Sequence, residues 1–574
     1  MKQKNLRSSH WYQGDPRNAF LHRSWMRRGN PDSAFDGSKP QIAVINTASG
    51  FSPCNAHLGE LAQSVNNGVW EAGGVPIEMP MISLGEPLMR PTAMLWRNLA
   101  AMATEELIRA NPVDGVVLLG GCDKTIPALL MGAISTGIPA IVIPGGPMLN
   151  GTFRGENMGC GTDVWKYSEQ VRAGKMSQEE FTSADKSMVR SKGHCNTMGT
   201  ASTMAAMAEA LGMTLPGVAG TPAPDSRLLE YSHLTGQRIV EMVGENLSPD
   251  KIINKASFHN AIVTLAGIGG STNALVHLIA IAGRLGIELT LEDFDRIGGK
   301  VPLIVNLKPA GEFLMEDLFR AGGLRAVLNE LKPLLDSTAI DVTGKPLVAN
   351  LENSFIWDAN VIRTLASPLQ PEAGIAVLRG NLAPTGAVIK PAAASKHLMK
   401  HRGPAVVFEN VEDFQARIDD PNLEITKDSV MVLRGCGPKG YPGMAEVSNM
   451  LLPKKILAQG ITDMVRVCDG RMSGTAYGTV VLHVSPEAAA GGPLGLVQNG
   501  DMIILDVEAR IIAIDISDEE LAKRKPLSAQ AAGYARPLRG YEKLYVDHVL
   551  QAPQGADFDF LLGSSGAPIP RESH

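Results

Sequence analysis

Three cysteines, Cys54, Cys122 and Cys195, each lie in a turn that contains glycine or proline and precedes a predicted helix. The start of a helix offers backbone N–H groups and a dipole that favour a thiolate. The cysteines are 68 and 73 residues apart, so only tertiary structure could gather them. Soft thiolates select iron–sulfur clusters or zinc, and three of them leave a coordination position open for substrate. One such thiol alone is more commonly a buried core residue, but three in matched contexts favour a Lewis-acid site.

Carboxylates and a lysine accompany these thiols. Asp123 and Lys124 directly follow Cys122, Glu86 lies in a turn before a helix, and Glu446 lies in a stretch rich in glycine. Carboxylates, together with water and substrate oxygens, suit Mg²⁺. Taken singly, Glu86 or Glu446 would more commonly be a capping or surface carboxylate. Lys124 leaves two interpretations open, a salt bridge to Asp123 or binding of a substrate carboxylate.

A candidate base lies in the loop 469–478, which follows an apolar strand-like segment. Ser473 precedes Gly474, where the backbone can approach a ligand closely. The surrounding residues depart from the Gly-x-Ser-x-Gly elbow, so hydrolase chemistry is disfavoured. A serine hydroxyl is a weak acid, so Ser473 could act as a base only if its surroundings stabilise the alkoxide. Thr475 is a candidate hydrogen-bonding neighbour of this alkoxide or of the substrate; the alternative for Ser473 is an ordinary turn residue.

Five long motifs occur along the chain in the order of a known enzyme family. They are SPCNAHL, GGCDKT, GHCNTMGTASTM, AGIGGSTNALVHL and GRMSGTAYG. In these residues the chain resembles the dihydroxy-acid and sugar-acid dehydratases, over about residues 42–514. Members of that family remove water from 2,3-dihydroxy acids by means of an iron–sulfur cluster and a divalent metal ion.

The resemblance implies a role for each candidate residue. Cys54, Cys122 and Cys195 would hold the cluster, and the presence of Cys54 indicates the [2Fe-2S] branch, because members that lack it tend to carry [4Fe-4S]. Ser473, as an alkoxide, would remove the proton from C2. The Mg²⁺ ligands would be the following residues: Glu86, Asp123, Glu446 and Lys124, the lysine being carbamylated. A lysine whose pKa is lowered by a nearby metal ion could react with CO₂ in this way.

The remaining cysteines and one further motif carry no assigned role. Cys160, Cys436 and Cys468 match no ligand position of the family and are interpreted as structural thiols. The segment 269–273 precedes a helix and is either an anion-binding helix start or a simple N-cap. No dinucleotide-binding fingerprint is present.

The elements that must position these residues indicate an α/β protein with two principal domains. Apolar strands at 42–47, 115–119 and 140–144 alternate with helices, which predicts a mostly parallel, doubly wound sheet in the domain that carries the cluster. Helices are also predicted at 201–211, 226–243 and 273–285. Short strands follow, which predicts a β-rich, barrel-like C-terminal domain; they are 405–408, 430–433, 464–467, 502–507 and 510–514. The predicted divisions are an N-terminal arm at 1–40, a cluster- and metal-binding domain at 41–375 and a domain at 376–574 that supplies the base.

Composition narrows the function class. Of 574 residues, 53 are Lys or Arg and 59 are Asp or Glu, a net charge of −6, so no overall basic field would recruit nucleic acid. No apolar run approaches the roughly 18–20 residues of a membrane span, and the N-terminus lacks the apolar segment of a secretory signal. Six cysteines in so long a chain suit a reducing compartment, which predicts a cytoplasmic enzyme. By analogy with the family, a homodimer or homotetramer is expected, with the aromatic-rich arm as a candidate interface.

The resemblance, together with the candidate residues, implies a hydro-lyase that converts a sugar acid to the 2-keto-3-deoxy acid. The stretch 84–95 resembles the pentonate dehydratases and lacks the Asp-Gly-Ile pattern of the biosynthetic branch. The expected substrate is therefore a pentonate such as L-arabinonate, with D-xylonate and D-gluconate as further candidates. One alternative is the dihydroxy-acid dehydratase of branched-chain amino-acid synthesis. An alternative of another class is a non-catalytic iron–sulfur sensor.

Overall fold

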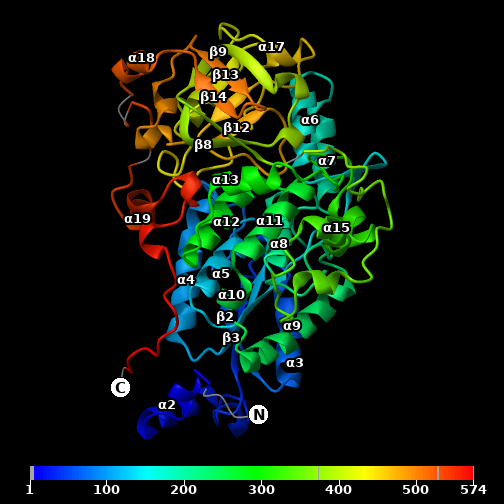
Figure 1. The fold of residues 1–574 in the computed structure, drawn as a ribbon, viewed down its shortest axis with the longest axis vertical. Coiled ribbons are helices and arrows are strands. Elements are labelled where there is room, and N and C mark those ends of the chain that lie inside the picture. The colour runs from blue at the N-terminus through cyan, green and yellow to red at the C-terminus, as the bar shows by residue number, and fades with distance from the viewer. Residues whose placement is uncertain (1–5, 373, 527–528, 530, 535, 573–574) are drawn as a thin grey trace.

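The chain forms an α/β body and a β-barrel that stack along the longest axis of the molecule (Figure 1). The structure is a computed structural model that describes residues 6–372, 374–526, 529, 531–534 and 536–572. The first helices, α1 (Ser9–Tyr12) and α2 (Pro16–Met26), lie at the end of the α/β body far from the barrel. Within this described part, no helix has both the length and the apolar character needed to cross a membrane.

The α/β body is built on a four-stranded parallel sheet with the order β2-β1-β3-β4. Its strands are β1 (Gln41–Asn46), β2 (Val75–Pro80), β3 (Gly115–Gly120) and β4 (Ala140–Pro144). Strands β1, β3 and β4 are buried along their whole length, as expected for apolar strands that are covered on both faces. The covering helices form two packed pairs: α3 (Leu58–Glu71) with α9 (Ser226–Glu245), and α4 (Arg97–Ala110) with α5 (Thr125–Ile134). The predicted doubly wound domain is confirmed.

The carboxyl ends of the parallel strands meet at one edge of this sheet. Asn46, the last residue of β1, is in register with Leu119 of β3, and Gly120 is in register with Pro144 of β4. The chain beyond β4 reaches His194, which forms a parallel bridge with Pro147. The turns that carry the three candidate cluster cysteines therefore begin at the same edge of the sheet.

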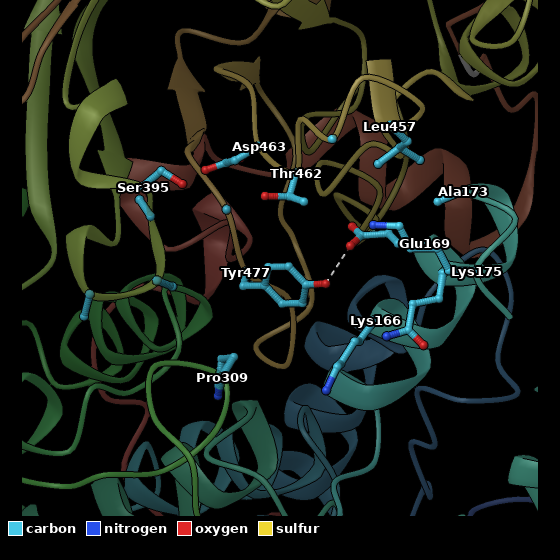
Figure 2. Close-up of a pocket in the computed structure, with 16 residues that line it drawn as sticks. Lys166, Glu169, Ala173, Lys175, Pro309, Ser395, Leu457, Thr462, Asp463 and Tyr477 are labelled. Atoms are coloured by element: carbon cyan, nitrogen blue, oxygen red, sulfur yellow. Dashed lines mark hydrogen bonds between the residues drawn. The ribbon is translucent and has the colours of Figure 1, made fainter. Parts of the chain in front are cut away.

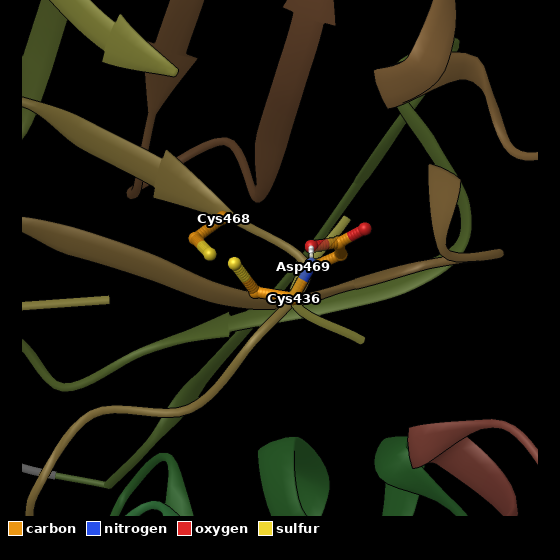
Figure 3. Close-up of side chains that lie close together, drawn as sticks. All are labelled: Cys436, Cys468 and Asp469. Carbon is orange, nitrogen blue, oxygen red and sulfur yellow. Dashed lines mark hydrogen bonds between the residues drawn. The ribbon is translucent and has the colours of Figure 1, made fainter. Parts of the chain in front are cut away.

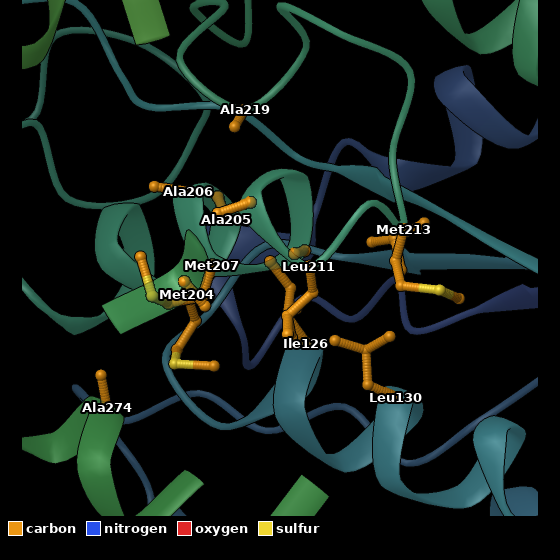
Figure 4. Close-up of a cluster of buried hydrophobic side chains, with 14 of the residues drawn as sticks. Ile126, Leu130, Met204, Ala205, Ala206, Met207, Leu211, Met213, Ala219 and Ala274 are labelled. Atoms are coloured by element: carbon orange, nitrogen blue, oxygen red, sulfur yellow. The ribbon is translucent and has the colours of Figure 1, made fainter. Parts of the chain in front are cut away.

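A largely helical region follows the sheet. The three helices predicted here begin and end within two residues of the expected bounds, as α8 (Thr200–Ala210), α9 and α12 (Asn273–Arg284). Every residue of α8 is buried, because small and apolar side chains surround this helix on all sides. Met204 and Met207 of α8 belong to the same core as Ile126 and Leu130 of α5 (Figure 4). The other helices of the body are α6 (Thr162–Arg172), α7 (Gln178–Met188), α10 (Pro249–Ile252), α11 (Lys255–Gly267), α13 (Leu291–Asp293), α14 (Met315–Arg320) and α15 (Gly323–Leu331).

The second half of the chain closes into an eight-stranded barrel, which confirms the barrel-like prediction. The order around the barrel is β10-β11-β12-β8-β7-β14-β13-β9, with parallel pairing from β9 through β12. The strands are β7 (Ala376–Gly380), β8 (Ala383–Ile389), β9 (Lys400–Phe408), β10 (Val430–Leu433), β11 (Arg466–Cys468), β12 (Val480–Ser485), β13 (Met502–Asp506) and β14 (Ile511–Ile514). The strand predicted at 464–467 begins later than expected, because its pairing with β10 starts at Arg466.

The parallel strands of the barrel explain how two distant loops meet. The chain leaves the carboxyl end of β10 toward Glu446 and the carboxyl end of neighbouring β11 toward Ser473. Both loops therefore start from the same rim. The chain beyond α19 (Gly540–His548) then returns to the α/β body, where Asp557 forms a buried ion pair with Arg284 of α12 at 2.6 Å.

Candidate active site

Two of the predicted cluster cysteines are in direct contact, and the third lies near them. Interaction with the Cys54 thiol, together with burial, raises the pKa of Cys122 well above its ordinary value. Burial also raises the pKa of Cys195, as do the negative charges of Cys54 and Asp123. Thiolates at this place therefore need a cation bound directly to sulfur, which is what iron or zinc provides. The donor set fits an iron–sulfur cluster.

Cys160, to which the sequence gives no ligand role, lies beside this group. Interaction of its side chain with the Cys195 thiol is the largest cause of the raised pKa of Cys195. The Cys160 backbone N–H also donates to the Asn196 Oδ1 at 2.8 Å. Nothing in the sequence around Cys160 indicates this placement, because the contact is made by two loops that are separated in the chain.

Lys124 is the centre of the second candidate group. Its Nζ atom lies 2.7 Å from Glu446 Oε1, 3.0 Å from Glu86 Oε2 and 3.2 Å from Asp123 Oδ2, and its side chain is fully buried. Burial by itself would lower the pKa of Lys124, but the three carboxylates outweigh it and the pKa is raised. The Lys124 ammonium also helps to lower the pKa of Glu86 against the opposing effect of burial. The amine pairs with Asp123, one of the two contacts that the sequence left open for it.

Neighbouring side chains hold these carboxylates in place. Arg471 Nη1 donates to Glu446 Oε1 at 2.9 Å, and the Thr92 hydroxyl donates to Glu86 Oε1 at 2.7 Å. The Asn273 amide donates to Glu446 Oε1 at 2.8 Å and to the Met472 carbonyl at 3.2 Å. Sequence reasoning gave Arg471, Asn273 and Thr92 no role of their own, although the first two stand in the motifs and Thr92 lies in the stretch 84–95. Asn273 is the first residue of α12, and its side chain reaches across to the barrel loops. The N-cap residue of this helix makes no side-chain capping hydrogen bond, so the simple N-cap expected at 269–273 is absent.

The carboxylate group fits a divalent cation. Glu86, Asp123 and Glu446 direct oxygens toward one buried position, which the Lys124 amine holds, and hard oxygen donors are what Mg²⁺ prefers. Beside them, the buried Asn273 Oδ1 has no hydrogen-bond partner. Such atoms are rare in folded proteins unless an ion, water or ligand completes them.

The Ser473 loop packs against glycine-rich segments of the α/β body. Ser473 Oγ lies 2.9 Å from Thr475 Oγ1, so the predicted neighbour contact is present. A Cβ atom on Gly474 would lie 2.7 Å from the backbone N of Thr200, too close for any other residue to fit without movement. Met472, which precedes Ser473, accepts the hydrogen bond from Asn273 that connects this loop to Glu446. Side chains from both halves of the chain thus form one site.

A cavity of about 590 Å³ lies beside this loop, between α6 and the barrel (Figure 2). Tyr477 and Glu169 line it and are joined by a 2.7 Å hydrogen bond from the Tyr477 hydroxyl. Its lining includes none of the predicted cysteines, carboxylates or Ser473. The cavity therefore adjoins the predicted site without containing its reactive groups.

A second cysteine pair lies in the barrel, away from the groups above. Potential ligand atoms of Cys436, Cys468 and Asp469 all lie within 4.8 Å of one another, and the three residues are buried (Figure 3). The Asp469 carboxylate, however, already accepts three backbone N–H groups, from Gly435, Cys436 and Ala488. It therefore has little remaining capacity for a metal ion and serves to hold the adjoining loops together.

Comparison with known proteins identifies the architecture just described. Residues 39–350 match the dihydroxy-acid/6-phosphogluconate dehydratase N-terminal domain, and residues 360–556 match the C-terminal domain of the same family. The chain belongs to the dihydroxy-acid/6-phosphogluconate dehydratase family. It is therefore a dehydratase, that is, a hydro-lyase, and the resemblance seen in its motifs is confirmed.

The sequence identity of this dehydratase to its relatives differs between those named for different substrates. An L-arabinonate dehydratase of Rhizobium leguminosarum bv. trifolii is 56% identical, over 100% of this chain and 99% of its own length. An L-arabonate dehydratase of Azospirillum brasilense is 56% identical over 99% of both chains. A dihydroxy-acid dehydratase of Methanothermobacter thermautotrophicus is 40% identical, over 88% of this chain and 92% of its own. Membership of the dehydratase family implies an iron–sulfur cluster and Mg²⁺, for which the donor groups described above are suited.

Proposed function

We propose that this dehydratase converts a sugar acid, with L-arabinonate as the first candidate, to the 2-keto-3-deoxy acid and water. The observation that carries the proposal is full-length identity of 56% to two enzymes named for L-arabinonate, against 40% to a dihydroxy-acid dehydratase. The composition of the site agrees, because its buried carboxylate, amide and guanidinium groups suit a substrate with several hydroxyls. D-Xylonate and D-gluconate are further candidates.

In this proposal Cys54, Cys122 and Cys195 hold a [2Fe-2S] cluster with one position open to the substrate. Glu86, Asp123, Glu446 and carbamylated Lys124 hold Mg²⁺. When bound, the two groups supply Lewis-acid stabilisation to the substrate carboxylate, the developing enolate and the departing hydroxide. Thiolate ligation is supported by the contact between Cys54 and Cys122, and the metal site by the carboxylates around Lys124.

The protein's own residues then perform the proton transfers. Ser473, as an alkoxide, removes the proton from C2, and the electron pair of that C–H bond forms the C2–C3 double bond as hydroxide leaves C3. The enol that results loses its hydroxyl proton, takes up a proton at C3 and becomes the ketone, and the departed hydroxide is protonated to water. Arg471 and Asn273 keep Glu446 in position through the reaction, since both donate hydrogen bonds to its carboxylate. Ser473 is supported in this role by the adjacent Thr475 hydroxyl.

A parallel assay of four acids tests the proposal. Cluster-loaded enzyme with Mg²⁺ is offered L-arabinonate, D-xylonate, D-gluconate and 2,3-dihydroxyisovalerate, and the 2-keto acid product is quantified. We expect the highest kcat/KM with L-arabinonate and little product from 2,3-dihydroxyisovalerate. A preference for the last acid would instead assign the chain to branched-chain amino-acid synthesis, and no product from any of the four would contradict the proposal.

We further propose a cytoplasmic homodimer or homotetramer. Six free cysteines suit a reducing compartment. On α2 of the N-terminal arm, Phe20 and Trp25 are 69% and 70% exposed, which is unusual for large apolar side chains outside an interface. Light scattering after size-exclusion chromatography measures the molar mass in solution, and the mass of a monomer would contradict the proposed oligomer.

A further inference from the structure

The N-terminal turn of α6 holds the Ser473 loop at Thr475. The Thr162 hydroxyl donates to the Thr475 carbonyl at 2.8 Å, and the Trp165 indole Nε1–H donates to Thr475 Oγ1 at 3.2 Å. Gly161, with φ +77°, passes so close to Thr475 that a Cβ atom there would collide with the threonine hydroxyl. Thr475 is itself buried, at 6% exposure. Its hydroxyl position is therefore determined by its neighbours.

The chemistry of the indole fixes the direction of one hydrogen bond of Thr475, and the charge of Ser473 fixes the direction of the other. An indole N–H can only donate, so Thr475 Oγ1 accepts from Trp165. The single hydroxyl proton of Thr475 then points away from the indole, and the other side-chain oxygen within reach is Ser473 Oγ at 2.9 Å. An alkoxide at Ser473 has no proton to donate, so Thr475 is the donor of this hydrogen bond whenever Ser473 is ionised. With this orientation the hydrogen bond favours a negative charge on Ser473. A hydrogen bond donated to an oxyanion is stronger than one donated to a neutral hydroxyl.

We propose that Trp165 is a positioning residue, which orients the Thr475 hydroxyl toward Ser473 and thereby lowers the pKa of the Ser473 hydroxyl. The inference rests on the proposed role of Ser473 as the base. Without the indole N–H, the Thr475 hydroxyl is free to rotate and to accept a hydrogen bond from the neutral Ser473 hydroxyl, which favours the neutral serine. Ser473 Oγ would then keep, within this loop, the Thr475 backbone N–H as a donor of fixed position, at 3.4 Å.

The variant that tests this proposal is Trp165→Phe in the cluster- and Mg²⁺-loaded enzyme. Phenylalanine keeps most of the ring that packs against the apolar core and loses only the N–H donor. We expect kcat to fall about tenfold, with KM nearly unchanged, because an oriented donor to the developing charge is lost. The basic group in the pH profile of kcat should titrate at higher pH. Trp357→Phe is the matched control, since Trp357 is 74% exposed and far from Thr475 in sequence.

Thr475 variants separate an orienting role from a packing role. Thr475→Val should lose at least as much activity as Trp165→Phe, and Thr475→Ser should keep most of it because the hydroxyl remains. The double variant Trp165→Phe with Thr475→Val should be no worse than Thr475→Val alone, since both act through one hydrogen bond. Additive losses would overturn the proposal, as would an unchanged pH profile in Trp165→Phe.

A second substitution covers the case in which phenylalanine disturbs the packing of α6. Benzothienylalanine at position 165 has almost the shape of tryptophan and replaces the N–H with sulfur. The same tenfold loss with unchanged iron content would support the proposal, and native activity would refute it. Failure of the proposed function is distinguishable, because the native enzyme would then give no 2-keto acid at all, whereas failure of this inference leaves native turnover intact.

Discussion

The Nζ atom of Lys124 lies 2.7 Å from Oε1 of Glu446, although the two residues are 322 positions apart in the chain. Lys124 follows strand β3 of the α/β body, and Glu446 belongs to a loop of the barrel. The contact shows that the two halves share one buried polar site. Substitutions on either side of this contact should therefore affect the same chemistry.

The cysteine assignments predict the iron content of the protein. Purified without oxygen, the native chain should hold about two irons and two sulfides. Cys54→Ser, Cys122→Ser and Cys195→Ser should each lose most of the cluster. Cys468→Ser is the matched control and should retain it, because its barrel thiol lies apart from the trio. Iron analysis and the visible absorption spectrum measure the outcome, and undiminished iron in the first three variants would refute the ligand assignment.

Ser473→Ala should abolish turnover with little effect on folding. The hydroxyl makes one side-chain hydrogen bond, to Thr475, so its loss costs little stability. Removing a base typically slows the reaction on the order of 10²–10⁴-fold. Exchange of the C2 hydrogen with deuterated solvent, if the native enzyme shows it, should vanish as well. Near-native activity would move the base elsewhere. His194 is the residue to test next: burial lowers its pKa to about 4, so the imidazole is neutral at pH 7.

Two substitutions of Lys124 distinguish the effect of its positive charge on stability from the effect of its proposed carbamylation on turnover. Lys124→Arg keeps a cation among the three carboxylates, so the fold should survive, but arginine cannot supply a carbamate ligand and turnover should fall more than 100-fold. Lys124→Met leaves buried carboxylates without their cation and should lower the free energy of unfolding by about 3–5 kcal/mol. Mn²⁺ binding followed by electron paramagnetic resonance, together with thermal melting, reports both effects. Full activity of Lys124→Arg would contradict the carbamate.

Lys390, at the junction of the two bodies, should make the stability of the protein depend on pH. Its buried Nζ donates to the Gly269 carbonyl at 2.6 Å, and burial lowers its pKa from 10.5 to about 8. Between these two values the unfolded chain binds the proton and the folded chain does not. This group therefore makes the free energy of unfolding rise with pH above about 8, and below that pH it contributes no slope.

Thermal melting between pH 7.5 and 9.5 checks this expectation. The melting temperature of Lys390→Met should rise less across this range than that of the native protein. Lys396→Met, at an exposed position, is the control and should keep the native slope. A native slope in Lys390→Met would show that Lys390 does not titrate in this window.

Much of this protein follows from local sequence. Apolar runs such as Val116–Leu119 predict buried parallel strands, because only strands covered on both faces are apolar at every position. The turns after those strands predict that Cys54 and Cys122 lie near one another, since parallel strands end at one edge. The motifs around Cys122 and Ser473 also predict the family, and the matches over both halves confirm it.

Other features depend on contacts between distant segments, and only the tertiary structure decided them. Three such contacts join loops that no periodicity relates. They are the interaction of Cys160 with Cys195, the Asn273 amide between Glu446 and Met472, and the Trp165 donor to Thr475. Local patterns report which face of an element is buried and where the chain turns. They do not report which two turns meet, because that is set by the packing of the barrel on the helices beneath it.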